Sequence, residues 1–168
     1  MGDEKDLDAL FERHSQRKAA AKKAADLEDD KRRAFRKRAS EVVDRVIVPA
    51  LEELAEELRA RGNRSAVKRC GENVVYPDVE FSFGPGGERA GVPYNPVSKL
   101  EYTSACTSDL DRPSFQSRPD ILVGSSRRDD EWSTHHSPMA QTRGIDHVDA
   151  EWVRAVALAF VEEVLRRI

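Results

Sequence analysis

The sequence predicts an α+β fold with a long N-terminal helical region, a mainly antiparallel sheet of three to five strands, and a C-terminal amphipathic helix packed on that sheet. Near both ends of the 168-residue chain, apolar residues recur every three or four positions, which is the period of a helix with one buried face. Between these ends the apolar period falls to two, as in a strand with one buried and one solvated face. Helices therefore frame a block of short strands.

The first segment, residues 3–27, is rich in alanine and other strong helix formers, and neither glycine nor proline interrupts it. We predict a helix here, with a thin apolar stripe. The stripe consists of Leu7, Leu10 or Phe11, His14, Ala21 and Ala25. A helix that buries so little apolar surface is marginal in isolation. We therefore expect residues 1–30 to be a charged extension that is either solvated and mobile or an interaction arm, for example a coiled coil.

A stronger stripe follows and opens the single α+β domain that we predict at residues 31–168. It consists of Phe35, Ala39, Val42, Val46, Ala50, Leu54 and Leu58. Pro49 lies within it and has no N–H to donate to the carbonyl of Arg45, so we predict either a kink or a second helical segment starting near Pro49. Gly62 and Asn63 then end the helix, because glycine readily takes the left-handed conformation found at helix C-termini.

The two-residue period of a strand is clearest where Val79, Phe81 and Phe83 alternate with polar residues. Further strand candidates are residues 67–70, 100–106, 121–123 and, at the edge of the sheet, 131–134. The expected connections are a turn at residues 84–87 and exposed loops at residues 107–119 and 124–144. The order of the strands in the sheet cannot be read from these patterns.

The C-terminal helix is predicted to begin after Asp149, whose carboxylate is suited to cap the first backbone N–H groups. Its buried face consists of Val153, Val156, Phe160 and Val164. We expect this helix to lie along the sheet or against the helix of residues 35–58.

Charge, cysteine content and the length of apolar runs indicate the environment of the protein. Residues 1–40 contain 12 basic and 9 acidic residues, which gives +3, and the remaining 16 basic and 22 acidic residues give −6. Two cysteines are too few for a disulfide framework, no secretory signal follows Met1, and no apolar run approaches the ~20 residues needed to cross a bilayer. We therefore expect a cytoplasmic protein without a membrane partner.

The best functional hint is a basic cluster of six cations within eight residues. It consists of Lys31, Arg32, Arg33, Arg36, Lys37 and Arg38. Such a cluster could neutralise phosphates and bind nucleic acid in a salt-dependent way. The acidic residues immediately before it, at positions 26–30, offer a different reading, in which the two blocks pair within one helix or between two antiparallel copies.

Other candidate sites have weaker patterns. Trp132 lies in a polar stretch and is either a contact residue or the anchor of an edge strand. His135 and His136 are metal-ligand types, but adjacent residues of a strand point to opposite faces and no zinc motif surrounds them. Cys70 and Cys106 have no nucleophile signature, and we interpret them as small strand residues.

These observations favour a small, non-catalytic cytoplasmic protein that associates with itself or with a protein partner through its N-terminal helix. The alternative is a nucleic-acid-binding accessory protein that uses the basic cluster. A less favoured alternative is an enzyme with a site near Trp132, His135 and His136. The sequence assigns no catalytic residue, no cofactor and no metal ligand.

Overall fold

The computed structural model describes most of the chain. The described ranges are residues 3–70, 78–84, 88–89, 92–93, 97–105, 112–123, 133–136 and 141–167. Contacts between residues divide the chain into two compact units, Met1–Phe35 and Arg36–Ile168, which we treat separately. The proposed domain boundary after residue 30 stays a prediction.

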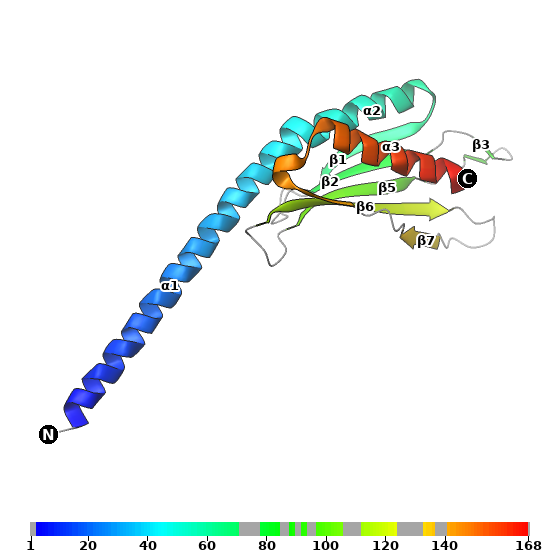
Figure 1. Ribbon diagram of the computed structural model, residues 1–168. Coiled ribbons are helices and arrows are strands. Elements are labelled where there is room, and N and C mark those ends of the chain that lie inside the picture. The colour runs from blue at the N-terminus through cyan, green and yellow to red at the C-terminus, as the bar shows by residue number, and fades with distance from the viewer. Residues whose placement is uncertain are drawn as a thin grey trace. The chain divides into compact units, whose positions relative to one another are not determined.

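The first unit is helical. Its helix, α1, spans Asp3–Val42, so it continues beyond the unit boundary without interruption (Figure 1). The helix predicted for residues 3–27 is therefore present. Every residue from position 6 to position 34 is exposed. In the second unit the same helix gains a buried side, where Ala39 is inaccessible to solvent.

A π-helical turn connects α1 to the next helix. This turn, η1, covers Val43–Ile47, and α2 follows at Val48–Ala60. The N–H of Val48 donates to the carbonyl of Val43, five residues back, in the hydrogen-bond pattern that defines a π-helix. The second segment predicted near Pro49 is thus present, but the chain reaches it through a wider helical turn rather than a break. Since Pro49 cannot donate to Arg45, the widened turn lies where the ordinary ladder would fail.

The C-terminus of α2 follows the sequence prediction. Gly62 has a positive φ of 80°. Its N–H donates to Arg59 at 2.9 Å, and the N–H of Asn63 donates to Leu58 at 3.0 Å. These two bonds form a Schellman motif, which satisfies carbonyls that the helix leaves unpaired.

The sheet has five strand positions, all antiparallel, in the order β1-β2-β5-β6-β7 (Figure 1). The strands are β1 Arg64–Cys70, β2 Asp78–Gly84, β5 Ser98–Ala105, β6 Ser114–Val123 and β7 Ser133–His136. A sixth strand, β8 at Gln141–Gly144, also pairs with β6. Because β7 pairs with residues 120–123 and β8 with residues 114–117, these two short strands share the fifth position.

Two loop predictions were wrong in part. The stretch 107–119 contains the first half of β6, and the stretch 124–144 contains β7 and β8. The edge strand predicted at residues 131–134 overlaps the first two residues of β7. The end of β6 was predicted at residues 121–123, but its first half was missed because it places Ser117, rather than an apolar residue, at a fully buried position. A separate two-stranded ribbon is formed by β3, Glu88–Arg89, and β4, Val92–Pro93. Of the predicted turn at 84–87, residues 85–87 lie outside the described part.

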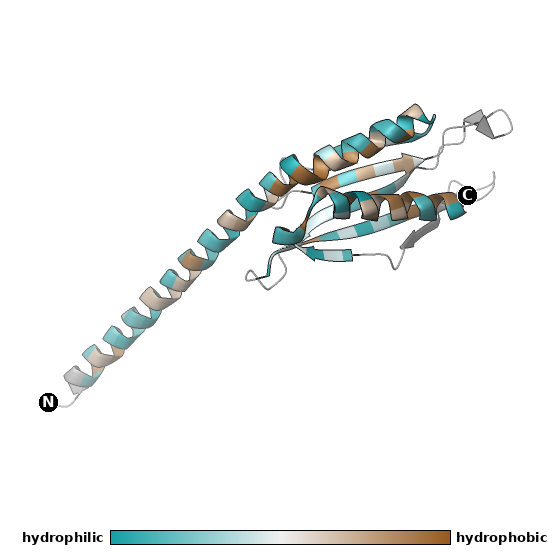
Figure 2. Cartoon of the chain, turned by 45° about the horizontal axis from the view of Figure 1, so that its top comes forward, coloured by the Kyte–Doolittle hydropathy of each residue, from teal (hydrophilic) through white to brown (hydrophobic). Residues whose placement is uncertain are grey.

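One face of the sheet builds the core beneath α2 and the C-terminal helix α3, Ala150–Arg167 (Figures 1 and 2). The sheet contributes Val79, Phe81, Phe83, Leu100, Tyr102, Phe115 and Ile121, all buried. Phe81 and Phe160 pack edge to face with ring centroids 6.2 Å apart. Helix α3 contacts both the sheet and α2, so both predicted packing arrangements are present together.

The start of α3 is fixed by the predicted cap. A carboxylate oxygen of Asp149 accepts a 2.7 Å hydrogen bond from the N–H of Trp152. No helix among the described residues is long and apolar enough to cross a membrane.

Candidate functional site

The helix of the first unit carries a regular row of positions on one side. Spacings of four and three residues alternate along it, which keeps every member on the same helix face. We call this row the seam, and it consists of Leu7, Phe11, His14, Lys18, Ala21 and Ala25. Its two ends differ in size, because the N-terminal end carries large apolar side chains and the C-terminal end carries alanines.

Large apolar side chains on this helix are exposed to solvent. Leu7 is 54% exposed, Phe11 is 67% exposed, and Leu10, which borders the seam, is 59% exposed. Leu27 is also 59% exposed, but it lies 20 residues after Leu7 and therefore about 200° around the helix from it. The apolar patch at the N-terminal end is thus local to one side, and Leu27 is an isolated residue on the other.

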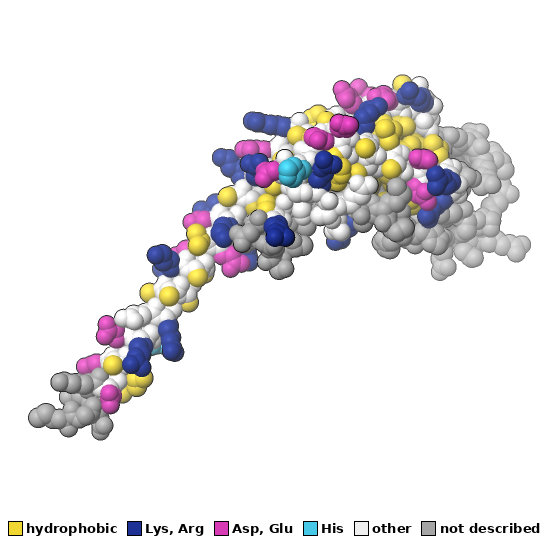
Figure 3. Space-filling model, viewed as in Figure 1, with side chains coloured by type: hydrophobic (Ala, Val, Ile, Leu, Met, Phe, Trp, Pro, Cys, Tyr) yellow, Lys and Arg dark blue, Asp and Glu magenta, His cyan; other side chains and the backbone are white. Residues whose placement is uncertain are grey.

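Charges along the same helix form blocks of alternating sign. Residues 3–12 contain five acidic and one basic residue, for a net charge of −4, and residues 13–25 contain five basic residues and no acidic one. Residues 26–30 contain four acidic residues. Charged side chains of both signs line the helix in Figure 3. The net charge of +3 for residues 1–40 as a whole does not show this alternation.

The basic cluster of the sequence analysis lies entirely on α1, and several of its members have acidic partners. Arg32 pairs with Glu28 at 2.6 Å and Arg33 with Asp30 at 3.9 Å, both within the helix. Arg38 pairs with Asp146, just before α3. Cations that are paired with carboxylates in this way are less available to bind phosphates.

The cations of the cluster also fail to share one side of the helix. Lys31 and Arg38 fall on one side and Arg33 and Lys37 on nearly the opposite one, because successive residues turn by about 100°. The apolar Phe35 between them is buried. The arrangement therefore surrounds the helix with charge rather than forming a single basic stripe.

Trp132 and Cys106 lie outside the described residues. His135 and His136 lie on β7, opposite Ile121 and Asp120 of β6 respectively, so their backbone positions alternate between the two faces of the sheet. Within the described ranges, no three histidine, cysteine, aspartate or glutamate residues come close enough together to hold a metal ion.

The sheet face away from the helices is polar and mixed in sign. Glu80, Glu101 and Arg118 occupy facing positions on β2, β5 and β6. Burial raises the pKa of the nearby Asp78 carboxyl, against the opposing effect of a backbone hydrogen bond from Ser104. These facing positions therefore carry charges of both signs.

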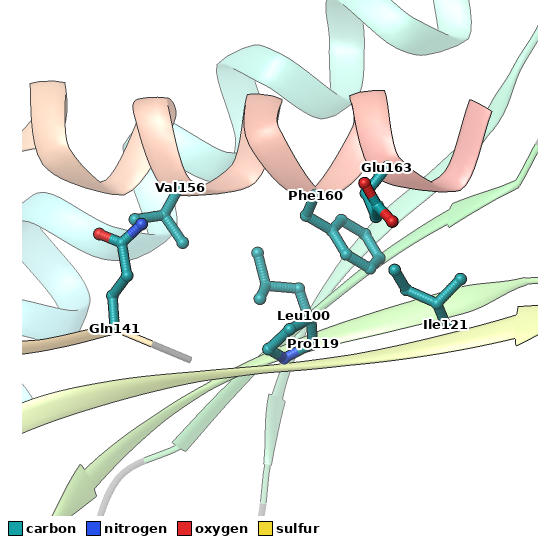
Figure 4. A pocket seen from close by; sticks show the side chains of 7 residues that line it. All are labelled: Leu100, Pro119, Ile121, Gln141, Val156, Phe160 and Glu163. Atoms are coloured by element: carbon teal, nitrogen blue, oxygen red, sulfur yellow. The ribbon is translucent and has the colours of Figure 1, made fainter. Parts of the chain in front are cut away.

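A small cavity lies between the sheet and α3 (Figure 4). Its lining is Leu100, Pro119, Ile121, Gln141, Val156, Phe160 and Glu163. The volume it offers to water is about 10 Å³, which corresponds to about one water molecule. It is a packing space beneath the helix, too small for a substrate.

Comparison with protein-family models, with curated proteins and with solved structures found no match. The two features from which a function can be argued are therefore the α+β fold and the exposed seam on the N-terminal helix. The stripe predicted from the sequence, with Phe11 as the alternative to Leu10, contains every member of the seam except Lys18. The alternating four-three spacing and the charge blocks are the signals that reveal the complete surface.

Proposed function

We propose that the protein is a non-catalytic, self-associating protein whose contact element is the seam side of α1. The observation that carries this proposal is the exposure of Leu7, Leu10 and Phe11 on a helix that is exposed throughout residues 6–34. Most helix stability in proteins comes from packing an apolar face, so a helix of this length with exposed apolar residues gains from a partner.

The size of the gain supports the proposal. Full burial of one large apolar side chain contributes roughly 1.5–3 kcal/mol, so three such residues on each of two copies contribute at most about 9–18 kcal/mol, against an association cost of about 4–15 kcal/mol. Isolated apolar residues on a surface need no explanation, but three within five positions on one side form a patch of the kind found at interaction sites.

The test is the mass of the full-length protein by size-exclusion chromatography with light scattering, over a range of concentrations. We expect the wild type to approach twice the monomer mass as concentration rises. Replacement of Leu7 and Phe11 together by serine is expected to leave a monomer, because it removes the large end of the seam.

Leu27→Ser is the matched control, since it removes an equally exposed leucine from the same helix on the opposite side. It is expected to associate like the wild type. Circular dichroism checks that all variants keep their helix content. A wild type that stays monomeric, or a Leu27→Ser variant as impaired as the seam variant, contradicts the proposal.

A further inference from the structure

We infer that the partner of the seam is the seam of a second copy running antiparallel, centred on Gln16. This inference rests on the proposed self-association and adds its direction and register. In this register, the residue numbers of two facing seam positions add up to 32. Leu7 packs against Ala25 of the partner copy, Phe11 against Ala21, and His14 against Lys18.

The sizes of the side chains select this direction. An antiparallel pair places each large residue of one copy beside an alanine of the other, so the helix axes stay evenly spaced along the contact. A parallel pair would instead place Phe11 against Phe11 at one end and Ala21 against Ala21 at the other. The helices would then be held apart at one end and face a void at the other, which costs packing energy.

The charge blocks select the same direction. In the antiparallel register the block at residues 3–12, with net charge −4, lies beside residues 20–29 of the partner copy, whose two basic and three acidic residues give a net charge of −1. In a parallel pair the block at residues 3–12 would instead lie beside its own copy, so that two net charges of −4 meet. The antiparallel arrangement therefore has the weaker repulsion between like charges.

Residues that border the seam agree with the register. Asp8 follows Leu7 and Lys22 follows Ala21, so both lie on the same side of the seam and meet across the antiparallel contact as an ion pair. On the other side, Leu10 precedes Phe11 and Ala24 precedes Ala25, which brings another large residue beside another alanine. The size pattern thus extends beyond the seam itself.

The middle of the seam limits the strength of the contact. His14 and Lys18 are polar, and polar residues at such positions define the register at a cost in stability. Beyond Ala25 the same row continues with Glu28 and Arg32, which are ion-paired with each other. The contact is therefore about 18 residues and 27 Å long, and it ends where the apolar residues end.

In the antiparallel arrangement, the paired helices act as a spacer between the two Phe35 residues of the dimer. Phe35 is the last residue of the first unit and lies 19 positions from the centre at Gln16. At 1.5 Å per residue, the two Phe35 residues of a dimer are about 57 Å apart along the axis. A parallel dimer would bring the same two points side by side. The direction of pairing thus decides whether the two chains continue from opposite ends or from one end.

The experiment measures the distance between spin labels in the full-length dimer. The label is attached at Leu27→Cys, on the side of α1 away from the seam, with Cys70→Ser and Cys106→Ser removing the native thiols. The antiparallel register places the two labels about 33 Å apart along the axis, since they lie 22 residues apart. A parallel dimer places them at the same height on helices whose axes are about 10 Å apart.

A second measurement leaves the wild-type sequence intact and covers the case in which the cysteine-free protein fails to fold. A carbodiimide joins carboxylates to amines that are in direct contact. In a mixture of isotopically light and heavy protein, the antiparallel register predicts Asp8–Lys22 links between copies. Within one chain these residues are 14 positions and about 21 Å apart, which is too far for such a link.

The outcomes separate the inference from the proposed function. A dimer with a label distance above about 33 Å, made up of the axial offset and the width of the pair, and with mixed-isotope Asp8–Lys22 links supports the inference. A dimer with a label distance clearly below about 33 Å, as expected when only the width of the pair separates the labels, overturns the antiparallel register and leaves self-association standing. A protein that remains monomeric overturns both.

Discussion

The hydroxyl of Tyr102 donates a 2.8 Å hydrogen bond to the carbonyl oxygen of Val153, linking the buried face of the sheet to α3. Tyr102 is fully buried, and its ring packs edge to face with Trp152, with centroids 6.0 Å apart. One side chain from the middle strand therefore positions the first turns of the helix by both a ring contact and a hydrogen bond.

Replacement of Tyr102 by phenylalanine tests the hydrogen bond alone, because the ring and most of its packing remain. We expect the free energy of unfolding to fall by about 1 kcal/mol, the usual net contribution of one hydrogen bond. Urea denaturation followed by circular dichroism measures this. Thr103→Val, on the polar face of the same strand, is the control and is expected to change stability less. Equal stability of Tyr102→Phe and wild type would refute the positioning role.

Gly62 provides a test of the helix end that is free of steric effects. A methyl group added at Gly62 meets no atom within 4 Å, so an alanine there is opposed only by the positive φ of 80°. We expect Gly62→Ala to lower the free energy of unfolding by about 1 kcal/mol.

The control for this change is Gly144→Ala. Gly144 has a φ of −57°, and a methyl group there meets its nearest atom, of His147, at an ordinary 3.5 Å. Its stability is expected to stay within about 0.5 kcal/mol of the wild type. If both variants lose the same amount, the left-handed conformation is not the cause of the loss at Gly62.

The ion pair between Glu57 of α2 and Arg154 of α3 predicts a dependence on acid. Both carboxylate oxygens lie 2.9 Å from the guanidinium of Arg154, and this hydrogen bonding lowers the pKa of Glu57. A lowered pKa in the folded state stabilises the protein above the pKa of the unfolded chain, about 4.3, and this contribution is lost as pH falls through the folded value.

We therefore expect the stability difference between the wild type and Glu57→Gln to be present at pH 6 and to shrink as pH falls below about 4.3. Urea midpoints measured from pH 6 to pH 3 give this difference. Because both side chains are partly exposed, added salt should also reduce it. Adding Arg154→Gln to Glu57→Gln should cause little further loss. A difference that stays constant with pH would show that the pair does not act through charge.

Local signals explain which parts of the fold were predictable. Asp149 as a cap and Gly62 as a helix end act through neighbouring backbone groups, so the sequence around them is sufficient. Strand β6 was only partly predictable, because Ser117 is buried and exchanges hydrogen bonds with Gln141 of β8, a residue distant in sequence. Pro119 weakens the strand pattern further, and it lies between the stretches of β6 that pair with β7 and β8.

The proposed contact surface was predictable in composition but not in partner. The apolar residues of the seam and the charge blocks can be read from residues 3–30, whereas the partner we propose, a second copy, follows only from comparing the two possible directions of pairing. Similarly, Pro49 identified the position of a helix irregularity, but not that it is a π-helical turn with Val43 and Ile47 buried in the core.

The most direct test of the central claim, that α1 pairs with α1 of a second copy, is the dimer dissociation constant in a charge-exchange series. Sedimentation equilibrium of the full-length wild type, Asp8→Lys, Lys22→Asp and the double variant provides it. Each single change turns two symmetric attractions into repulsions and should raise the dissociation constant about tenfold, an effect reduced by salt. The double variant restores both pairs and should recover to within about threefold of the wild type. A double variant that dimerises no better than the single variants would contradict the antiparallel pairing of the two helices, in which Asp8 faces Lys22.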